Sequence, residues 1–123
     1  MSNPRATAPT ASCIAAANEF TSDLAAKAAE RAMKMAGVTA DQLDAFIPHQ
    51  ANLHIIDAMV KKLALPPSVA IARDVVDTGN TSAASIPLAM AQGIADGRIK
   101  PGQLLLVEAM GGGLTWGAAV IRL

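Results

Sequence analysis

The sequence predicts an α/β fold: a mixed, mostly parallel sheet with helices on both faces and a final antiparallel hairpin. Helix-like and strand-like segments alternate along the chain, and such alternation is typical of parallel strands joined by helices. The strand-like runs are short and apolar, as expected for buried strands. Only a short glycine-rich link separates the last two runs, so this pair is predicted to be antiparallel.

Length and composition indicate one domain with an aliphatic core. The chain has 123 residues, of which 52% are hydrophobic, yet it contains only two Phe, one Trp and no Tyr. Its first dozen residues are rich in Pro, Thr, Ser and Ala. We therefore expect residues 1–20 to form a mobile tail and residues 21–123 to form the domain.

The first part of the domain contains helix signals around one short apolar run. Residues 22–36 are predicted to form a helix that ends at Gly37. Residues 39–42 match a capping box for a single turn. The apolar run of residues 45–48 is long enough only for a buried strand, and Asn52 can cap the amphipathic helix that follows.

The second part of the domain alternates in the same way. A helix is predicted over about residues 82–95, and Pro87 requires that it either begins near Ser85 or is kinked. The remaining strands are predicted over residues 69–76, 103–109 and 116–123.

Charge and cysteine content exclude several classes of function. Ten basic and ten acidic residues cancel, so no net field attracts nucleic acid or an anionic membrane. No apolar run reaches the roughly 18 residues that a membrane span needs, and no signal-peptide pattern is present. The single cysteine, Cys13, allows no internal disulfide, which suits the cytosol. We expect a cytoplasmic protein.

Polar and glycine residues follow the ends of three predicted strands. His49 comes directly after the first strand, Asn80 after the second, and residues 111–113 form a triple glycine after the third. Taken singly, His49 and Asn80 are each more simply explained as structural residues, and the glycines as a hairpin turn. In α/β sheets, however, ligands bind where the carboxyl ends of strands meet. Together these residues predict a candidate cleft.

Other chemistry finds less support. His49 and His54 do not have the four-residue spacing that would place them together on one helical face, so we predict no metal site. Cys13 could act as a nucleophile beside His and Asn, but its place in the predicted tail favours an incidental cysteine. Asp77 and Glu108 also lie near strand ends, where we expect structural roles. No phosphate-loop or dinucleotide glycine pattern occurs.

Four motifs in order resemble the carboxy-terminal half of β-ketoacyl-acyl-carrier-protein synthase III. The resemblance covers roughly residues 18–123 and is weakest before Gly37. The motifs are Ile-Pro-His-Gln-Ala-Asn-Leu over residues 47–53, Gly-Asn-Thr-Ser-Ala-Ala-Ser-Ile-Pro over 79–87, Asp-Gly-Arg-Ile-Lys-Pro-Gly-Gln over 96–103, and Glu-Ala-Met-Gly-Gly-Gly-Leu-Thr-Trp-Gly over 108–117.

The resemblance implies a thiolase-like half-domain and a specific reaction. That family joins an acyl-CoA primer to malonyl-acyl-carrier protein (malonyl-ACP), and no bound cofactor is expected. By motif position, His49 and Asn80 would stabilise the enolate formed as carbon dioxide leaves. Gly112 would supply a backbone N–H to the acyl oxyanion hole. Asn52 and His54 would lie at the entrance for carrier protein and CoA, where relatives usually have Arg in place of His54.

The same resemblance implies that much of the enzyme is not in this chain. The amino-terminal half, with its nucleophilic cysteine and dimer interface, has no counterpart, and the sheet is expected to have four strands where the family has five. We expect a fragment, a split gene product or a trimmed chain that does not condense substrates alone. The alternative is a non-catalytic subunit or binding module that completes a separate amino-terminal half. The complete enzyme is expected to be a homodimer.

Overall fold

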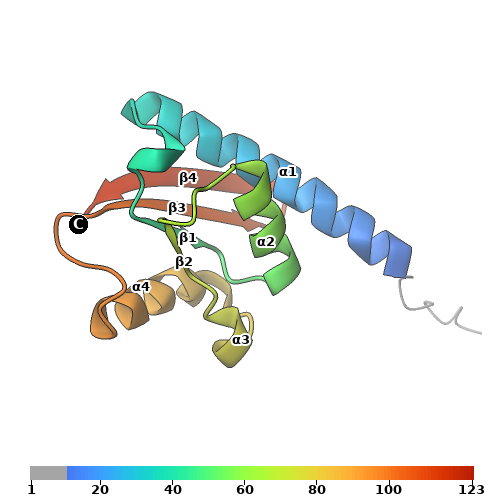
Figure 1. Ribbon diagram of the computed structural model, residues 1–123. Helices are drawn as coiled ribbons and strands as arrows, with labels where there is room; N and C mark the ends of the chain where they lie inside the picture. The colour runs from blue at the N-terminus through green and yellow to red at the C-terminus, as the bar shows by residue number, and fades with distance from the viewer. Residues whose placement is uncertain (1–10) are drawn as a thin grey trace, which may run out of the picture.

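The computed structural model describes the backbone of residues 11–123 and the side chains of residues 18–123. In it, helices pack on both faces of one sheet (Figure 1). The strands are β1 (Ala45–Pro48), β2 (Ala70–Ile71), β3 (Leu104–Gly111) and β4 (Thr115–Arg122). The α-helices are α1 (Ala11–Ala36), α2 (Leu53–Lys62), α3 (Val75–Thr78) and α4 (Ser85–Ala95), and single 3-10 turns occupy η1 (Ala40–Gln42) and η2 (Ser82–Ala84).

The sheet has the mixed topology that the sequence predicts. Its four strands lie in the order β2-β1-β3-β4. β1 pairs in parallel with both β2 and β3, and β3 pairs with β4 as an antiparallel hairpin. Pro48 lies opposite Glu108 at the carboxyl end of the parallel pair. The carboxyl ends of β1 and β3 therefore lie together.

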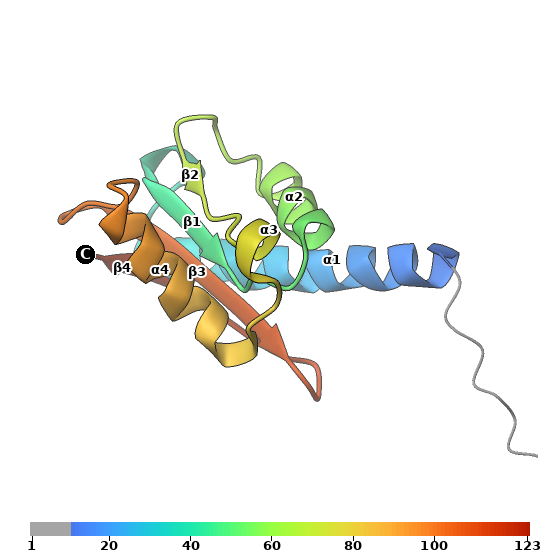
Figure 2. The ribbon, with the colours of Figure 1, turned by 90° about the horizontal axis from the view of Figure 1, so that it is seen from below.

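Two hydrophobic clusters fill the space on the two faces of the sheet. Phe46 and Leu106 point toward α1 and α2, where they join a cluster that includes Ala25, Ala29 and Met59. On the other face, Ile47 and Leu105 pack with Ala89 of α4. Viewed from the α4 side, α3 and α4 lie in front of the sheet and α1 behind it (Figure 2). The alternation of side chains along β1 and β3 assigns neighbouring residues to opposite clusters.

Helix α1 is longer than predicted. It begins at Ala11 rather than near Ser22, inside the segment expected to be a mobile tail. It ends at Ala36, where Gly37 takes a positive φ of 69°, as a helix-terminating glycine does. Cys13 belongs to the first turns of this helix backbone. Residues 1–10 lie outside the described part of the chain, so the predicted tail stays a prediction there.

The strand predicted over residues 69–76 is wrong for most of its length. Only Ala70 and Ile71 pair with β1, and the chain then turns into the short helix α3. The side chain of Gln50 explains the change, because its Oε1 accepts the N–H of Val75 at 3.0 Å. Its Nε2 donates to the carbonyl of Ala72 at 3.2 Å, where the strand ends. A β-branched pair at Val75 and Val76 favours a strand locally, and these tertiary hydrogen bonds override that preference.

Helix α4 begins at Ser85, the first of the two predicted alternatives. Pro87 then falls in the first helical turn, where its missing N–H leaves no hydrogen bond unmade. One face of α4 carries Ser85, Ala89 and Gly93, all buried, at a spacing of four residues. Small residues on this face let the helix backbone approach the sheet closely.

Candidate active site

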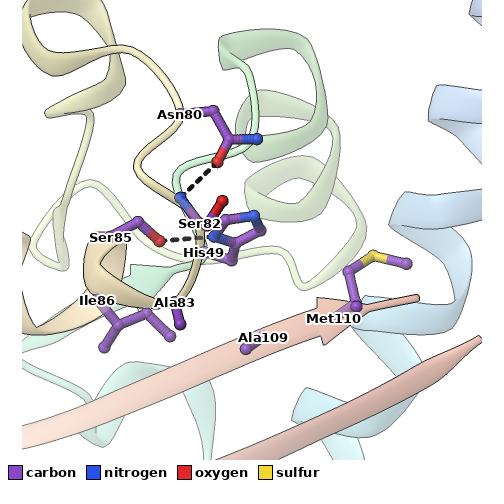
Figure 3. Close-up of a pocket in the computed structure, with 9 residues that line it drawn as sticks. His49, Asn80, Ser82, Ala83, Ser85, Ile86, Ala109 and Met110 are labelled. Carbon is purple, nitrogen blue, oxygen red and sulfur yellow. Dashed lines mark hydrogen bonds between the residues drawn. The ribbon is translucent and has the colours of Figure 1, made fainter.

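The carboxyl ends of β1 and β3 and the loop before α4 enclose a cavity of about 380 Å³ (Figure 3). It brings together two of the predicted site residues, His49 and Asn80, which are 31 positions apart in the sequence. The lining residues are His49, Asn80, Ser82, Ala83, Ser85, Ile86, Ala109, Met110 and Gly111. The candidate cleft is therefore a real cavity, with a polar wall of His, Asn and Ser facing an apolar wall from β3.

Backbone pairing fixes the position of His49. Its N–H donates to the carbonyl of Glu108 at 2.7 Å, which extends the β1–β3 ladder by one residue. Its ring points toward the start of α4, where Nδ1 lies 2.6 Å from Oγ of Ser85. Partial burial lowers the pKa of His49 below its ordinary value of 6.5. Burial thus favours the neutral imidazole, in which one ring nitrogen carries a hydrogen.

Local backbone geometry fixes the orientation of Asn80. Gly79 has a positive φ of 67°, which lets the chain turn sharply out of α3. Asn80 Oδ1 then accepts the N–H of Ser82 at 2.9 Å, an Asx turn that a sequence of Asn-Thr-Ser favours. Since the oxygen is occupied, the Nδ2 amide group is left to donate. In Figure 3 this nitrogen points away from the Ser82 bond.

The other predicted site residues lie outside this cavity. Gly112 is exposed in the β3–β4 turn, while its neighbour Gly111 lines the cavity. Asn52 caps α2, because its Oδ1 accepts the N–H of Ile55 at 2.9 Å, which confirms the predicted cap. His54 is exposed in the first turn of α2.

Two residues beside the site have burial and contacts that are not evident from the sequence. Ser85 is 2% exposed and contacts His49, but it reads in the sequence as one more small residue of a helix. Glu108 is also 2% exposed, and its Oε1 has no hydrogen-bond partner among the described residues. Burial raises the pKa of Glu108 to about 7. By the alternation of side chains along β3, its side chain shares the sheet face of Leu106, and it is not among the residues that line the cavity.

Within residues 11–123, no helix has both the length and the apolar character needed to cross a membrane. The part of the chain with described side chains also holds no group of three His, Cys, Asp or Glu residues placed to bind a metal ion. The polar side chains that line the cavity are those of His49, Asn80, Ser82 and Ser85.

The fold and the site together define a thiolase-like half-domain whose cavity is lined by His49, after β1, and by Asn80, after α3. The chain belongs to the family described as 3-oxoacyl-acyl-carrier-protein (ACP) synthase III C terminal, whose model matches residues 33–123. This finding confirms the resemblance read from the motifs, and the mixed α/β architecture confirms the predicted fold class.

Relatives and solved structures agree with this assignment. The chain is 57% identical over 98 residues to β-ketoacyl-acyl-carrier-protein synthase III 1 of Streptomyces avermitilis, covering 80% of this chain and 28% of that protein. It is 56% identical over 96 residues to the synthase III of Jannaschia sp., covering 78% of this chain and 29% of the relative. The crystal structure of the Aquifex aeolicus synthase III matches with a TM-score of 0.81 and 39% identity, over 89% of this chain and 35% of that one.

The priming β-ketosynthase of a polyketide biosynthetic pathway matches with a TM-score of 0.77 and 39% identity, over 87% of this chain and 33% of that one. The chain thus spans less than a third of the length of the Streptomyces avermitilis and Jannaschia sp. relatives.

Proposed function

We propose that this chain is the decarboxylating half of a condensing acyltransferase that joins an acyl-CoA primer to malonyl-ACP. In this proposal, His49 and Asn80 bind the thioester oxygen of the malonyl group. The observation that carries it is that His49 and Asn80, distant in the sequence, line the same cavity. Nδ1 of His49 and Oδ1 of Asn80 both have partners in the protein, so Nε2 and Nδ2 are the groups left for a ligand.

Two fixed donors suit the charge that develops in this reaction. When carbon dioxide leaves, the bond between the carboxylate and the methylene carbon breaks, and its electron pair forms the enolate. Negative charge then appears on the thioester oxygen. Donors that are already aimed at that oxygen stabilise the transition state without reorganising. A neutral His49 suits this role, because it can donate without first gaining a proton.

The second half of the reaction requires groups from another polypeptide segment. The enolate carbon attacks an acyl thioester, and the leaving thiolate belongs to a nucleophilic cysteine of the amino-terminal half. Gly112, in the β3–β4 turn, would donate its N–H to the oxyanion of that step, and Asn52 and His54 would lie on the approach of the carrier protein. ACP, acyl-CoA and the homodimer of the complete enzyme are thus part of the proposal.

The chain alone is predicted to be inactive in condensation. Incubation with acyl-CoA and mass spectrometry of the intact chain should show no acylated residue. Stoichiometric labelling that disappears in Cys13→Ser would contradict this prediction, because it would make Cys13 a nucleophile of this chain.

The donor pair is tested by joining the chain with a separate amino-terminal thiolase-fold half through co-expression. Removing one oxyanion donor typically costs about 10²- to 10³-fold in rate. His49→Ala and Asn80→Ala should each lower the rates of malonyl decarboxylation and condensation by about 10²- to 10³-fold. Lys27→Ala, an exposed substitution on α1, is the control and should keep full activity. Activity within a few-fold of wild type in His49→Ala would rule out the assigned role.

A second candidate function is a non-catalytic subunit that completes a separate amino-terminal half. Exposed apolar side chains on the α4 side of the sheet favour this candidate: Leu88 is 49% exposed, Ile94 48% and Ile121 37%. Co-expression separates the possibilities. Restored condensation that needs His49 supports a catalytic half, restored condensation in His49→Ala supports a binding subunit, and an inactive, aggregating chain indicates an unsupported fragment.

A further inference from the structure

The hydroxyl of Ser85 lies at the meeting point of α4 and the His49 loop. Ser85 Oγ is 2.6 Å from His49 Nδ1 and 3.2 Å from the backbone nitrogen of Gln50. The residue is 2% exposed, so water does not substitute for these contacts. The same hydroxyl therefore holds both the ring of His49 and the backbone of the next residue.

The hydrogens available on each group determine the direction of the two hydrogen bonds that Ser85 Oγ makes. The N–H of Gln50 can only donate, so one lone pair of Ser85 Oγ accepts it. The hydroxyl has a single hydrogen, and His49 Nδ1 is its one hydrogen-bond acceptor among the described residues. If Nδ1 were protonated instead, Oγ would accept two hydrogen bonds and its own hydrogen would be buried without a partner. Leaving a buried donor without a partner destabilises that arrangement, because its lost contact with water is not replaced.

We propose that Ser85 is a positioning residue that keeps His49 in the tautomer with the hydrogen on Nε2. Nδ1 then accepts from Ser85, and Nε2–H is the donor presented to the cavity. The role given to His49 rests on the proposed function, but its tautomer can be measured on the chain alone. Ser85 itself touches no reacting atom in this proposal, because it acts through the ring of His49.

Two neighbouring observations agree with this assignment. Gln50 is 1% exposed and its side chain bonds Pro48, Ala72 and Val75, so its backbone N–H is held in place opposite Ser85. Ser85 is the first residue of α4, so the position of its hydroxyl follows the position of the helix. The helix and the His49 loop thus hold the ring from both sides.

The test uses nitrogen-15 labelling of histidine, since the chain contains only two His residues. His54, which is exposed, gives the second ring signal and serves as an internal reference, and His54→Gln assigns it. At pH 7.5 the wild-type His49 ring should show a protonated Nε2 and an unprotonated, hydrogen-bonded Nδ1. A protonated Nδ1 would overturn the proposal without the need for any variant.

Ser85→Ala removes the hydroxyl, and Ser85→Thr retains it. In Ser85→Ala, the Nδ1 signal should lose its hydrogen-bond shift, the second tautomer should appear, and the pKa of His49 should rise. Ser85→Thr should restore the wild-type pattern. An unchanged His49 spectrum and pKa in a folded Ser85→Ala variant would refute the inference, while the wild-type tautomer remains decisive if the variant does not fold.

Activity in the co-expressed enzyme separates this inference from the proposed function. A neutral hydrogen bond contributes about 0.5–1.5 kcal/mol, which corresponds to roughly a two- to thirteenfold loss of kcat in Ser85→Ala with KM unchanged. If Ser85→Ala changes the tautomer of His49 but the His49→Ala enzyme keeps its activity, the proposed function fails and the positioning role of Ser85 stands.

Discussion

At the scale of single residues, two titratable groups, the partly buried His49 and the buried Glu108, lie near the carboxyl ends of β1 and β3 but on opposite faces of the sheet. His49 lines the cavity, while Glu108, whose carbonyl accepts the His49 N–H, shares the face of β3 that carries Leu106. Burial lowers the pKa of His49 and raises that of Glu108 to about 7. In both cases burial disfavours the charged form, so each group is easier to keep neutral in the folded state.

Glu108 makes the stability of the chain depend on pH. The folded state holds the proton more tightly than the unfolded state, where the carboxyl has its ordinary pKa of 4.5. The stability contribution is therefore fully present below pH 4.5, is lost as the pH rises to about 7, and is constant above that. The loss is on the order of 3 kcal/mol.

Glu108→Gln should remove this dependence, because glutamine has no proton to lose. Urea unfolding at pH 5, 6, 7 and 8 measures this dependence as the change in the free energy of unfolding with pH. Glu30→Gln, an exposed carboxylate on α1, is the matched control and should retain the wild-type dependence. If the free energy of unfolding changed equally with pH in wild type and Glu108→Gln, burial would not raise the pKa of this carboxyl.

At the scale of elements, one glycine allows α4 to pack against the segment that leads into β3. A Cβ added to Gly93 would lie 2.6 Å from Cδ1 and 2.9 Å from Cγ1 of Ile99, which is itself 5% exposed. Such distances require a shift of the Ile99 side chain or of the helix. The close approach therefore depends on the absence of a side chain at Gly93.

Gly93→Ala should destabilise the chain even though alanine is the better helix former. Overpacking costs about 1–3 kcal/mol, against a helix-propensity gain of about 1 kcal/mol. Thermal or urea unfolding should show the net loss, and adding Ile99→Val should recover part of it by removing Cδ1. Gly112→Ala is the control for stability, since its Cβ would meet no atom within 4 Å. A more stable Gly93→Ala variant would contradict the packing argument.

The elements also show where sequence reasoning succeeds and where it fails. The boundaries of β1 and the capped start of α2 follow from local signals, an apolar run and an Asn cap. The segment of residues 72–78 does not, because its turn into α3 is fixed by the side chain of Gln50, 25 positions before Val75. Ser85 is missed for the same reason, since its partner His49 is 36 positions away. Contacts of this range leave no local pattern.

At the scale of the whole molecule, the two faces of the sheet are covered unequally. Helix α1 crosses the face of β3 and β4 that carries Leu106 and Val120. On the other face, Leu105 is buried with α4, but its cross-strand partner Ile121 is 37% exposed. Helix α4 also turns Leu88 and Ile94 outward. The α4 side is therefore a surface suited to a further apolar partner.

Leu88→Lys and Ile121→Lys should weaken binding of a co-expressed amino-terminal half without unfolding the chain. Each places a charge in an apolar contact and leaves the described core intact. Co-purification measures the binding, and thermal unfolding of the chain alone checks the fold. Met35→Lys is the control, because Met35 is 80% exposed at the end of α1 and lies away from the α4 face. Undiminished co-purification of both variants would exclude this face as the interface.

The single backbone hydrogen bond from His49 to Glu108 has a consequence for how the cavity can change shape. It fixes one wall to the central sheet, so His49 and the start of the glycine turn move as one body. Residues 80–83, the rest of the polar wall, are held by the end of α3 and an Asx turn instead. Adaptation to ligands of different size should therefore occur through the Asn80 side alone, with the histidine as the fixed reference point of the site.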